Sequence, residues 1–165
     1  MTPTTMAAWA AIGALVVAGS ATAQQQPTQQ QTAHQADHRI VAPQDIRWTA
    51  GPPSLPKGSE VAVLYGNPTM EGPFAMRLRF PANYRIPAHS HPGAEVVTIL
   101  SGTFGIGMGS EADKGKTQAI PAGGFVALPP NSPHFAFIEE PTVVQINSIG
   151  PWSVNYVNAN EDPRK

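Results

Sequence analysis

The chain has 165 residues, with 18 prolines, 15 glycines, no cysteine and a formal net charge of −1. This length suits one domain, and the absence of cysteine excludes disulfides, thiolate nucleophiles, iron–sulfur clusters and zinc fingers. The basic residues are scattered, so the sequence lacks the basic patch of a nucleic-acid binder and we expect no nucleic-acid partner.

Residues 1–23 have the pattern of an export signal. An apolar run of about 13 residues, from Met6 to Ala18, is followed by Ala21-Thr22-Ala23, which offers the small side chains that a leader peptidase requires. The run is shorter than the roughly 20 residues that cross a bilayer. No Lys or Arg precedes it, so a retained membrane anchor or a wrongly assigned start are the alternatives. We expect cleavage after Ala23, a periplasmic or secreted protein, and no membrane anchor after processing.

Residues 24–45 are expected to form a flexible linker. The stretch is rich in glutamine and shows no hydrophobic periodicity, so it cannot bury enough apolar surface to offset the entropy of ordering. His34 and His38 lie in this stretch, and we expect both to be solvated rather than bound to metal.

Residues 46–160 have the texture of short strands and turns, with no helix pattern and no internal repeat. Phe74, Met76, Leu78 and Phe80 alternate with other residues and so share one face, which leaves Arg77 and Arg79 on a solvated outer face. Further strands are expected at Phe104–Met108, Glu60–Tyr65, Glu95–Leu100, Phe125–Leu128, His134–Ile138, Thr142–Ile149 and Ser153–Val157. Turns rich in Pro, Gly and Asn separate them. The pattern favours an all-β sandwich or barrel, with residues 161–165 as a C-terminal tail.

The pair His89-Ser90-His91 is the first sign of a metal site. Side chains two apart in a strand point to the same face, so both imidazoles can reach one ion. Glu95 has the same parity, but in a straight strand it would lie about 13 Å beyond His91, so Pro92-Gly93-Ala94 must bend the chain sharply. His134 follows the rigid stretch 129–133, which could aim it at the first pair. Three imidazoles and one carboxylate suit a divalent Fe, Mn, Ni, Cu, Co or Zn ion without choosing among them.

These residues carry a resemblance to a known family. The stretch His89-x-His91-x3-Glu95-x6-Gly102 resembles the first motif of the cupins, and Gly123-x5-Pro129-x-Asn131-x2-His134 resembles the second. Asn131 replaces a usual glycine, which is tolerable because Asn also enters left-handed turns, and Ile138 stands where asparagine is common. The resemblance implies a small exported single-domain cupin with a double-stranded β-helix (jelly-roll) barrel, with His89, His91, Glu95 and His134 as metal ligands. Cupins often pair through their sheets, so it also implies a homodimer.

The function stays open between classes. The resemblance implies a dioxygenase-like oxidoreductase that acts on a small organic substrate at open metal positions. The alternatives are a non-catalytic module that binds a small molecule or sugar, and a cupin isomerase or decarboxylase. No acid–base residue can be placed beside the metal, and Gln145 and Asn147 are candidates only because they interrupt an apolar strand. Tyr65, Tyr84 and Tyr156 could supply a proton donor or serve the structure. The side chains that could line a substrate cavity, with core packing as the alternative, are Phe104, Ile106, Met108, Phe135, Phe137 and Trp152.

Overall fold

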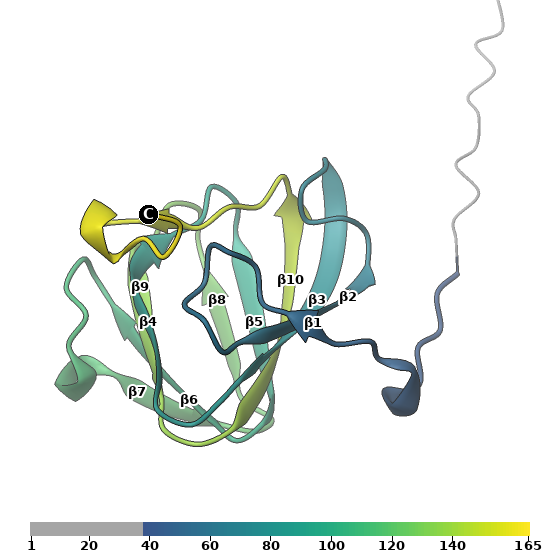
Figure 1. Cartoon of the computed structure of the whole chain (residues 1–165), viewed down its shortest axis with the longest axis horizontal. Coiled ribbons are helices and arrows are strands. Elements are labelled where there is room, and N and C mark those ends of the chain that lie inside the picture. The colour runs from purple at the N-terminus through teal and green to yellow at the C-terminus, as the bar shows by residue number, and fades with distance from the viewer. Residues whose placement is uncertain (1–37) are drawn as a thin grey trace, which may run out of the picture. The chain divides into compact units, whose positions relative to one another are not determined.

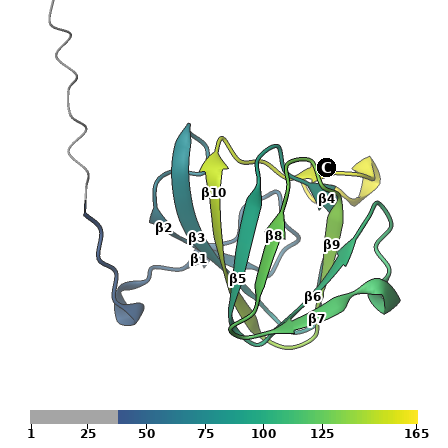
Figure 2. The same cartoon turned by 180° about the vertical axis from the view of Figure 1, so that it is seen from behind.

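Two antiparallel sheets form the body of the computed structural model, which describes residues 38–165 (Figures 1 and 2). Sheet A has the strand order β1 (Thr49–Ala50), β2 (Glu60–Tyr65), β3 (Gly72–Phe80), β10 (Thr142–Gly150), β5 (Glu95–Ser101) and β8 (Phe125–Leu128). Sheet B has the order β11 (Asn155–Tyr156), β4 (Tyr84–Ser90), β9 (His134–Ile138), β6 (Thr103–Met108) and β7 (Gln118–Pro121). The other elements in the described part are the 3-10 turns Pro43–Asp45, Lys114–Lys116 and Ala159–Glu161.

The chain crosses between the sheets at almost every step. From β3 to β10 it alternates between sheet A and sheet B, except that β6 and β7 pair as a hairpin within sheet B. This winding of two strand layers about one core is the jelly-roll arrangement. The predicted all-β fold, a cupin-type double-stranded β-helix, is confirmed.

Alternating side chains of the sheets fill the space between them. Phe74, Met76, Leu78 and Phe80 of β3 are at most 3% exposed, as the alternation predicts, while Arg79 on the outer face pairs with Glu60 at 2.9 Å. The core continues through Val97, Ile99, Ile106, Ile138, Val144 and Ile146 of the other strands. Burial of this apolar surface is the main stabilising contribution to the barrel.

The strand boundaries follow the sequence pattern closely, with β4 as the main omission. The expected strands at 60–65, 125–128 and 134–138 have the predicted bounds, and Ser153–Val157 shortens to β11. Only the end of β4, at His89 and Ser90, was expected as strand, because Pro87 interrupts its earlier part and proline lacks the N–H that a ladder needs. The structure accommodates Pro87 at a register shift between Ile86 and His89.

Several predictions concern residues at or beyond the margins of the described part. The expected signal peptide at 1–23 lies outside it, as do His34 and residues 24–37 of the expected linker, whereas His38 is exposed. At the other terminus, Arg164 donates to the Val154 carbonyl at 3.0 Å and Glu161 pairs with Arg85 at 2.8 Å, so residues 161–165 contact the barrel. Within residues 38–165, no helix has the length and apolar character needed to cross a membrane.

Candidate metal centre

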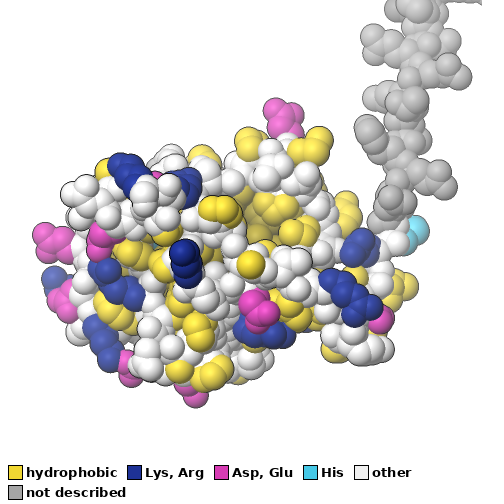
Figure 3. Space-filling model, in the orientation of Figure 1, with side chains coloured by type: hydrophobic (Ala, Val, Ile, Leu, Met, Phe, Trp, Pro, Cys, Tyr) yellow, Lys and Arg dark blue, Asp and Glu magenta, His cyan; other side chains and the backbone are white. Residues whose placement is uncertain are grey.

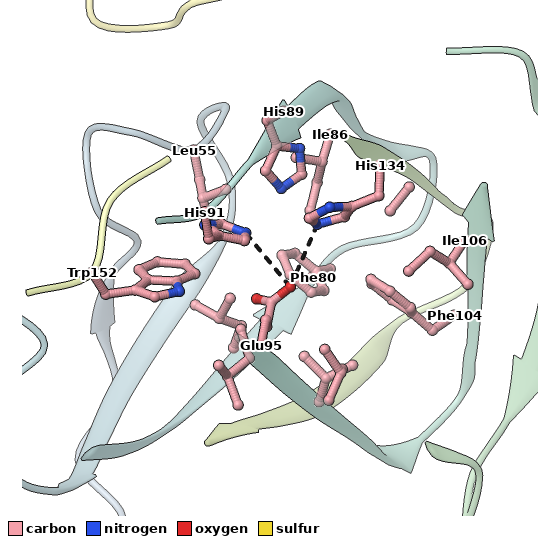
Figure 4. A pocket seen from close by; sticks show the side chains of 15 residues that line it. Leu55, Phe80, Ile86, His89, His91, Glu95, Phe104, Ile106, His134 and Trp152 are labelled. Atoms are coloured by element: carbon pink, nitrogen blue, oxygen red, sulfur yellow. Dashed lines mark ion pairs between the residues drawn. The ribbon is translucent and has the colours of Figure 1, made fainter. Parts of the chain in front are cut away.

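His89, His91, Glu95 and His134, here named the His/Glu cluster, meet inside the barrel (Figure 4). His89 lies near the end of β4, Glu95 begins β5 and His134 begins β9, while His91 follows β4 directly. Each of the four residues is at most 5% exposed. The structure therefore brings together the same four side chains that the sequence pattern selected.

The bend predicted between His91 and Glu95 is present. Pro92–Ala94 carries the chain from β4 in sheet B to β5 in sheet A. As a result the Nε2 atom of His91 lies 3.5 Å from Oε2 of Glu95, rather than the 13 Å or so expected along a straight strand. A Cβ on Gly93 would lie 3.3 Å from the Ile149 carbonyl oxygen, so glycine suits this close passage.

A second turn brings His134 to the same place. Residues 129–133 connect β8 of sheet A to β9 of sheet B, and Asn131 takes the left-handed conformation with φ 59°. The Asn131 N–H donates to the His91 carbonyl at 2.7 Å, which ties this turn to the first motif. The expectation that asparagine could replace glycine here is confirmed.

Backbone carbonyls fix the orientation of all three imidazoles. The Nδ1–H group of His89 donates to Pro87 O at 2.7 Å, that of His91 to Ser153 O at 2.7 Å, and that of His134 to Ser132 O at 2.9 Å. A carbonyl oxygen only accepts, so Nδ1 carries the proton and Nε2 presents a lone pair. Such partners on the remote nitrogen are the usual support of a metal-binding histidine.

Burial favours the neutral form of the His89 and His91 imidazoles. Burial, together with repulsion from His134 and His91, lowers the pKa of His89 from 6.5 to about 3. Burial also lowers the pKa of His91, although the Glu95 carboxylate opposes this effect. Neutral imidazole is the form that binds a metal, so both rings are ready to bind at neutral pH.

The three histidine nitrogens are spaced for one ion, and the Glu95 carboxylate lies beside two of them. One nitrogen from each of His89, His91 and His134 lies within 4.8 Å of the other two, and Oε2 of Glu95 lies 3.4 Å from Nε2 of His134. Two donors about 2 Å from one ion lie roughly 3 to 4 Å apart. The buried Nε2 of His91 has no hydrogen-bond partner, because this nitrogen and the Glu95 carboxylate 3.5 Å away are both acceptors. A cation would satisfy this nitrogen, so the residues fit a metal ion.

A cavity at the cluster is otherwise lined by apolar side chains. Its free space is about 30 Å³, room for roughly one or two water molecules. Besides the His/Glu cluster, its walls are Leu55, Leu78, Phe80, Ile86, Val97, Phe104, Ile106, Ala136, Val144, Ile146 and Trp152. Only a very small molecule fits this free space.

The predicted cavity walls divide into two groups. Phe104, Ile106 and Trp152 do line the cavity, whereas Met108 is 56% exposed. Phe135 and Phe137 alternate with His134 and Ala136 along β9 and therefore face away from the cavity. Met108 shares the strand face of Phe104 and Ile106 and pairs with His134, but it ends β6 and is exposed rather than part of the wall.

Gln145 and Asn147 do not serve the cavity. They alternate with Val144 and Ile146, which line it, and so lie on the outer face of β10. There the Gln145 side chain accepts from Nε of Arg77 at 3.1 Å. The hypothesis that either residue acts on a substrate is wrong for this reason.

A loop that the sequence pattern did not single out closes the barrel wall. Residues 51–59, here named the seam loop, run between β1 and β2 and place Leu55 in the cavity wall. Tyr156 donates to the Ser54 carbonyl at 2.7 Å, and Tyr84 donates to the Pro56 carbonyl. The two tyrosines thus hold the seam loop across the gap between the sheets (Figure 1). Beside it, hydrophobic side chains gather in a shallow hollow (Figure 3).

Comparisons with known proteins agree with this fold. The chain is similar to the polyketide cyclase RemF from Streptomyces resistomycificus, with 20% identity, a TM-score of 0.60, and 77% of this chain and 90% of that chain covered. It is also similar to a candidate acetylacetone dioxygenase from Methylibium petroleiphilum PM1, with 18% identity, a TM-score of 0.59, and 76% of this chain and 85% of that chain covered. An RmlC-like cupin from Shewanella frigidimarina NCIMB 400 has 14% identity and a TM-score of 0.54, with 69% of this chain and 93% of that chain covered. No curated protein matches the sequence.

The family is established by a match over most of the chain. The model of the ChrR cupin-like domain matches residues 36–152, which include both cupin motifs and all four residues of the His/Glu cluster. The structures named above are too distant in sequence to show more than the fold. The two sheets, the motif residues and the family match lead to one conclusion: this chain belongs to the ChrR cupin-like domain family.

Proposed function

We propose that the chain binds one divalent transition metal through Nε2 of His89, His91 and His134 and the carboxylate of Glu95. The observation that carries this proposal is the convergence of three buried lone pairs, each fixed by an Nδ1–H bond to a backbone carbonyl. The unpaired Nε2 of His91 costs free energy in an apolar cavity, and a cation removes that cost. This donor set accepts Fe, Mn, Ni, Cu, Co or Zn.

The proposed activity is a dioxygenase-like reaction on a small organic substrate. Four protein donors leave open positions on an ion that accepts five or six, and a bound metal would there supply Lewis-acid and redox chemistry. The apolar walls exclude water from these positions and favour a substrate with an apolar body. The fold likeness to a candidate acetylacetone dioxygenase supports this reading by analogy.

The cavity lining bears on the alternative functions. Within residues 38–165, the polar side chains of the lining are the His/Glu cluster and the Trp152 indole. An isomerase or decarboxylase usually needs a further proton donor or acceptor, and a sugar-binding site needs many polar partners. Both fit these walls less well, while a module that binds a small apolar molecule beside the metal fits equally and is the second candidate.

We also propose that the chain acts outside the cytoplasm, as a periplasmic or secreted protein. The short apolar run ending in Ala21-Thr22-Ala23 supports this location. Intact-mass measurement of protein from the native host should give a chain beginning at Gln24. A cytoplasmic species that retains Met1 would contradict the proposal.

Elemental analysis tests the metal site. The wild-type chain should hold about one metal per chain, and His134→Ala should weaken binding by more than the 10–100-fold typical of losing a supporting partner of a ligand. His38→Ala is the matched control, because His38 is exposed. Its metal content should equal that of the wild type. An unchanged metal content in a folded His134→Ala variant would refute the site.

The open coordination position needs a separate measurement. The Co(II)-loaded chain should show the spectrum of five or six donors, and this spectrum should change when azide is added. A four-coordinate spectrum that is indifferent to azide would favour a closed structural site and refute the enzyme.

A further inference from the structure

Trp152 occupies a special place beside the His/Glu cluster. Its indole stacks on the His91 ring with a centroid separation of 4.3 Å and an angle of 16° between the planes. Phe74 packs edge-on against the same indole at 6.1 Å, and the Trp152 N–H of the backbone donates to the Pro68 carbonyl at 2.7 Å. The indole is therefore held firmly, with its position set by three neighbours.

The indole nitrogen has no partner of its own. Nε1 of Trp152 is buried and makes no hydrogen bond with any described residue, although buried tryptophan usually finds an acceptor. Trp152 lines the cavity, and its nitrogen lies on the side of the ring that faces Glu95 (Figure 4). This atom can only donate, so its missing partner must be an acceptor.

The charge of the site specifies the kind of acceptor. This step rests on the proposed function: a divalent ion, three neutral imidazoles and one carboxylate carry a net charge of +1. The described apolar walls offer no counter-charge to balance it. In a cavity of low dielectric constant, a ligand with a single negative charge is strongly favoured over a neutral or cationic one.

We infer that Trp152 is a binding residue for a small organic monoanion with two oxygens, a carboxylate or an enolate. One oxygen takes an open metal position and the other accepts from the Trp152 indole N–H. The apolar remainder of the ligand packs against the cavity walls. With only about 30 Å³ free, the cavity accommodates the smallest members of this class.

The test uses formate as the probe and the Zn(II)-loaded full chain. Trp152→Phe removes the N–H but keeps an aromatic ring beside His91, and Trp48→Phe is the matched control, because Trp48 lies under the Arg79 guanidinium. The affinity for formate should be the same in the wild type and the control. In Trp152→Phe this affinity should be lower by about tenfold or more, as expected for a lost hydrogen bond to a charged acceptor.

An independent measurement follows the indole itself by NMR. The spectra of Trp152→Phe and Trp48→Phe assign the two indole N–H resonances, because each variant lacks one of them. Formate should shift the Trp152 resonance and leave the Trp48 resonance in place. Equal formate affinity in Trp152→Phe and wild type, no formate binding by a chain that holds one Zn(II), or an unmoved Trp152 resonance would each overturn the inference while the metal site stands. Loss of metal from Trp152→Phe would also overturn the inference, since the indole would then support the metal ligand His91 rather than bind the anion. A wild-type chain that holds no metal would instead refute the proposed function.

Discussion

The two ends of the barrel interior are made by the same strands, but apolar side chains pack together at one end and polar side chains converge at the other. Along β4 and β9, Tyr84 pairs with Ile138 at one end and His89 with His134 at the other. At the first end, here named the apolar end, the Phe80 ring lies 5.1 Å from Tyr84 and 6.2 Å from Phe104. At the second end, three buried imidazoles converge, and Nε2 of His91 has no hydrogen-bond partner.

This difference separates stability from binding. The apolar end gains free energy from burial and packing whether or not a ligand is present. The His/Glu cluster costs free energy to bury until a cation satisfies it. Phe80 and Phe104 also line the cavity, but they offer no donor to a metal. We therefore expect changes at the apolar end to lower the free energy of unfolding without altering metal binding, and changes within the cluster to alter metal binding.

The largest expected effect comes from the apolar end. Phe80→Ala should lower the free energy of unfolding by about 3–5 kcal/mol, because the Phe80 side chain is 1% exposed and its removal leaves a cavity. Urea denaturation of the metal-free chain measures this loss.

Metal serves as the control for this variant. Saturating Zn(II), at about 100 times its dissociation constant, should add about 2.7 kcal/mol of stability to both wild type and Phe80→Ala. A Phe80→Ala chain that folds but gains nothing from Zn(II) would show that the two ends are coupled, and would break the comparison.

The same division explains how much the sequence could predict. Alternation along β3 and the spacing of His89, His91 and Glu95 are local patterns. The fold class and the members of the cluster could therefore be predicted from the sequence. The sheet pairing that leaves Phe135 on the outer face of sheet B is not local, and neither is the seam loop that brings Leu55 to the cavity. Leu55 lies among prolines and glycines with no periodicity, so nothing in its neighbourhood marks it as a wall residue.

The next effect in size is the acid sensitivity of the cluster. In the metal-free chain, the pKa of His89 is lowered to about 3, while in the unfolded chain it is near 6.5. Between these values the unfolded state binds one more proton than the folded state, so stability falls as the pH falls. Each such histidine should contribute up to about 1.4 kcal/mol per pH unit.

Urea denaturation at a series of pH values, with chelator present, measures this slope. His89→Gln should make the slope shallower below pH 6.5, since a titrating group is removed, whereas His38→Gln should leave it unchanged because His38 is exposed. An identical slope in His89→Gln and wild type would show that burial of His89 does not govern the acid response.

The smallest effects concern the seam loop, which runs past both ends. Tyr156 holds Ser54, and Tyr156 lies opposite His89 in the pairing of β11 with β4, while Tyr84 holds Pro56 at the apolar end. Tyr156→Phe and Tyr84→Phe should each cost about 1 kcal/mol of unfolding free energy, the usual value of one hydrogen bond. The cavity has only about 30 Å³ of free space, so we expect a ligand to displace part of the wall as it enters. Leu55 belongs to the wall segment that these two bonds hold. Tyr156→Phe should therefore speed formate binding to the Zn(II)-loaded chain and speed hydrogen exchange at the Leu55 amide, which donates to the Pro52 carbonyl at 2.9 Å.

Two variants serve as controls for this prediction. Tyr84→Phe should lower stability without speeding formate binding, and Tyr65→Phe, at an exposed position of β2, should change neither stability nor binding. If both Tyr156→Phe and Tyr84→Phe speed binding equally, the seam loop moves as one unit, and access to the metal is not governed at the His89 end alone.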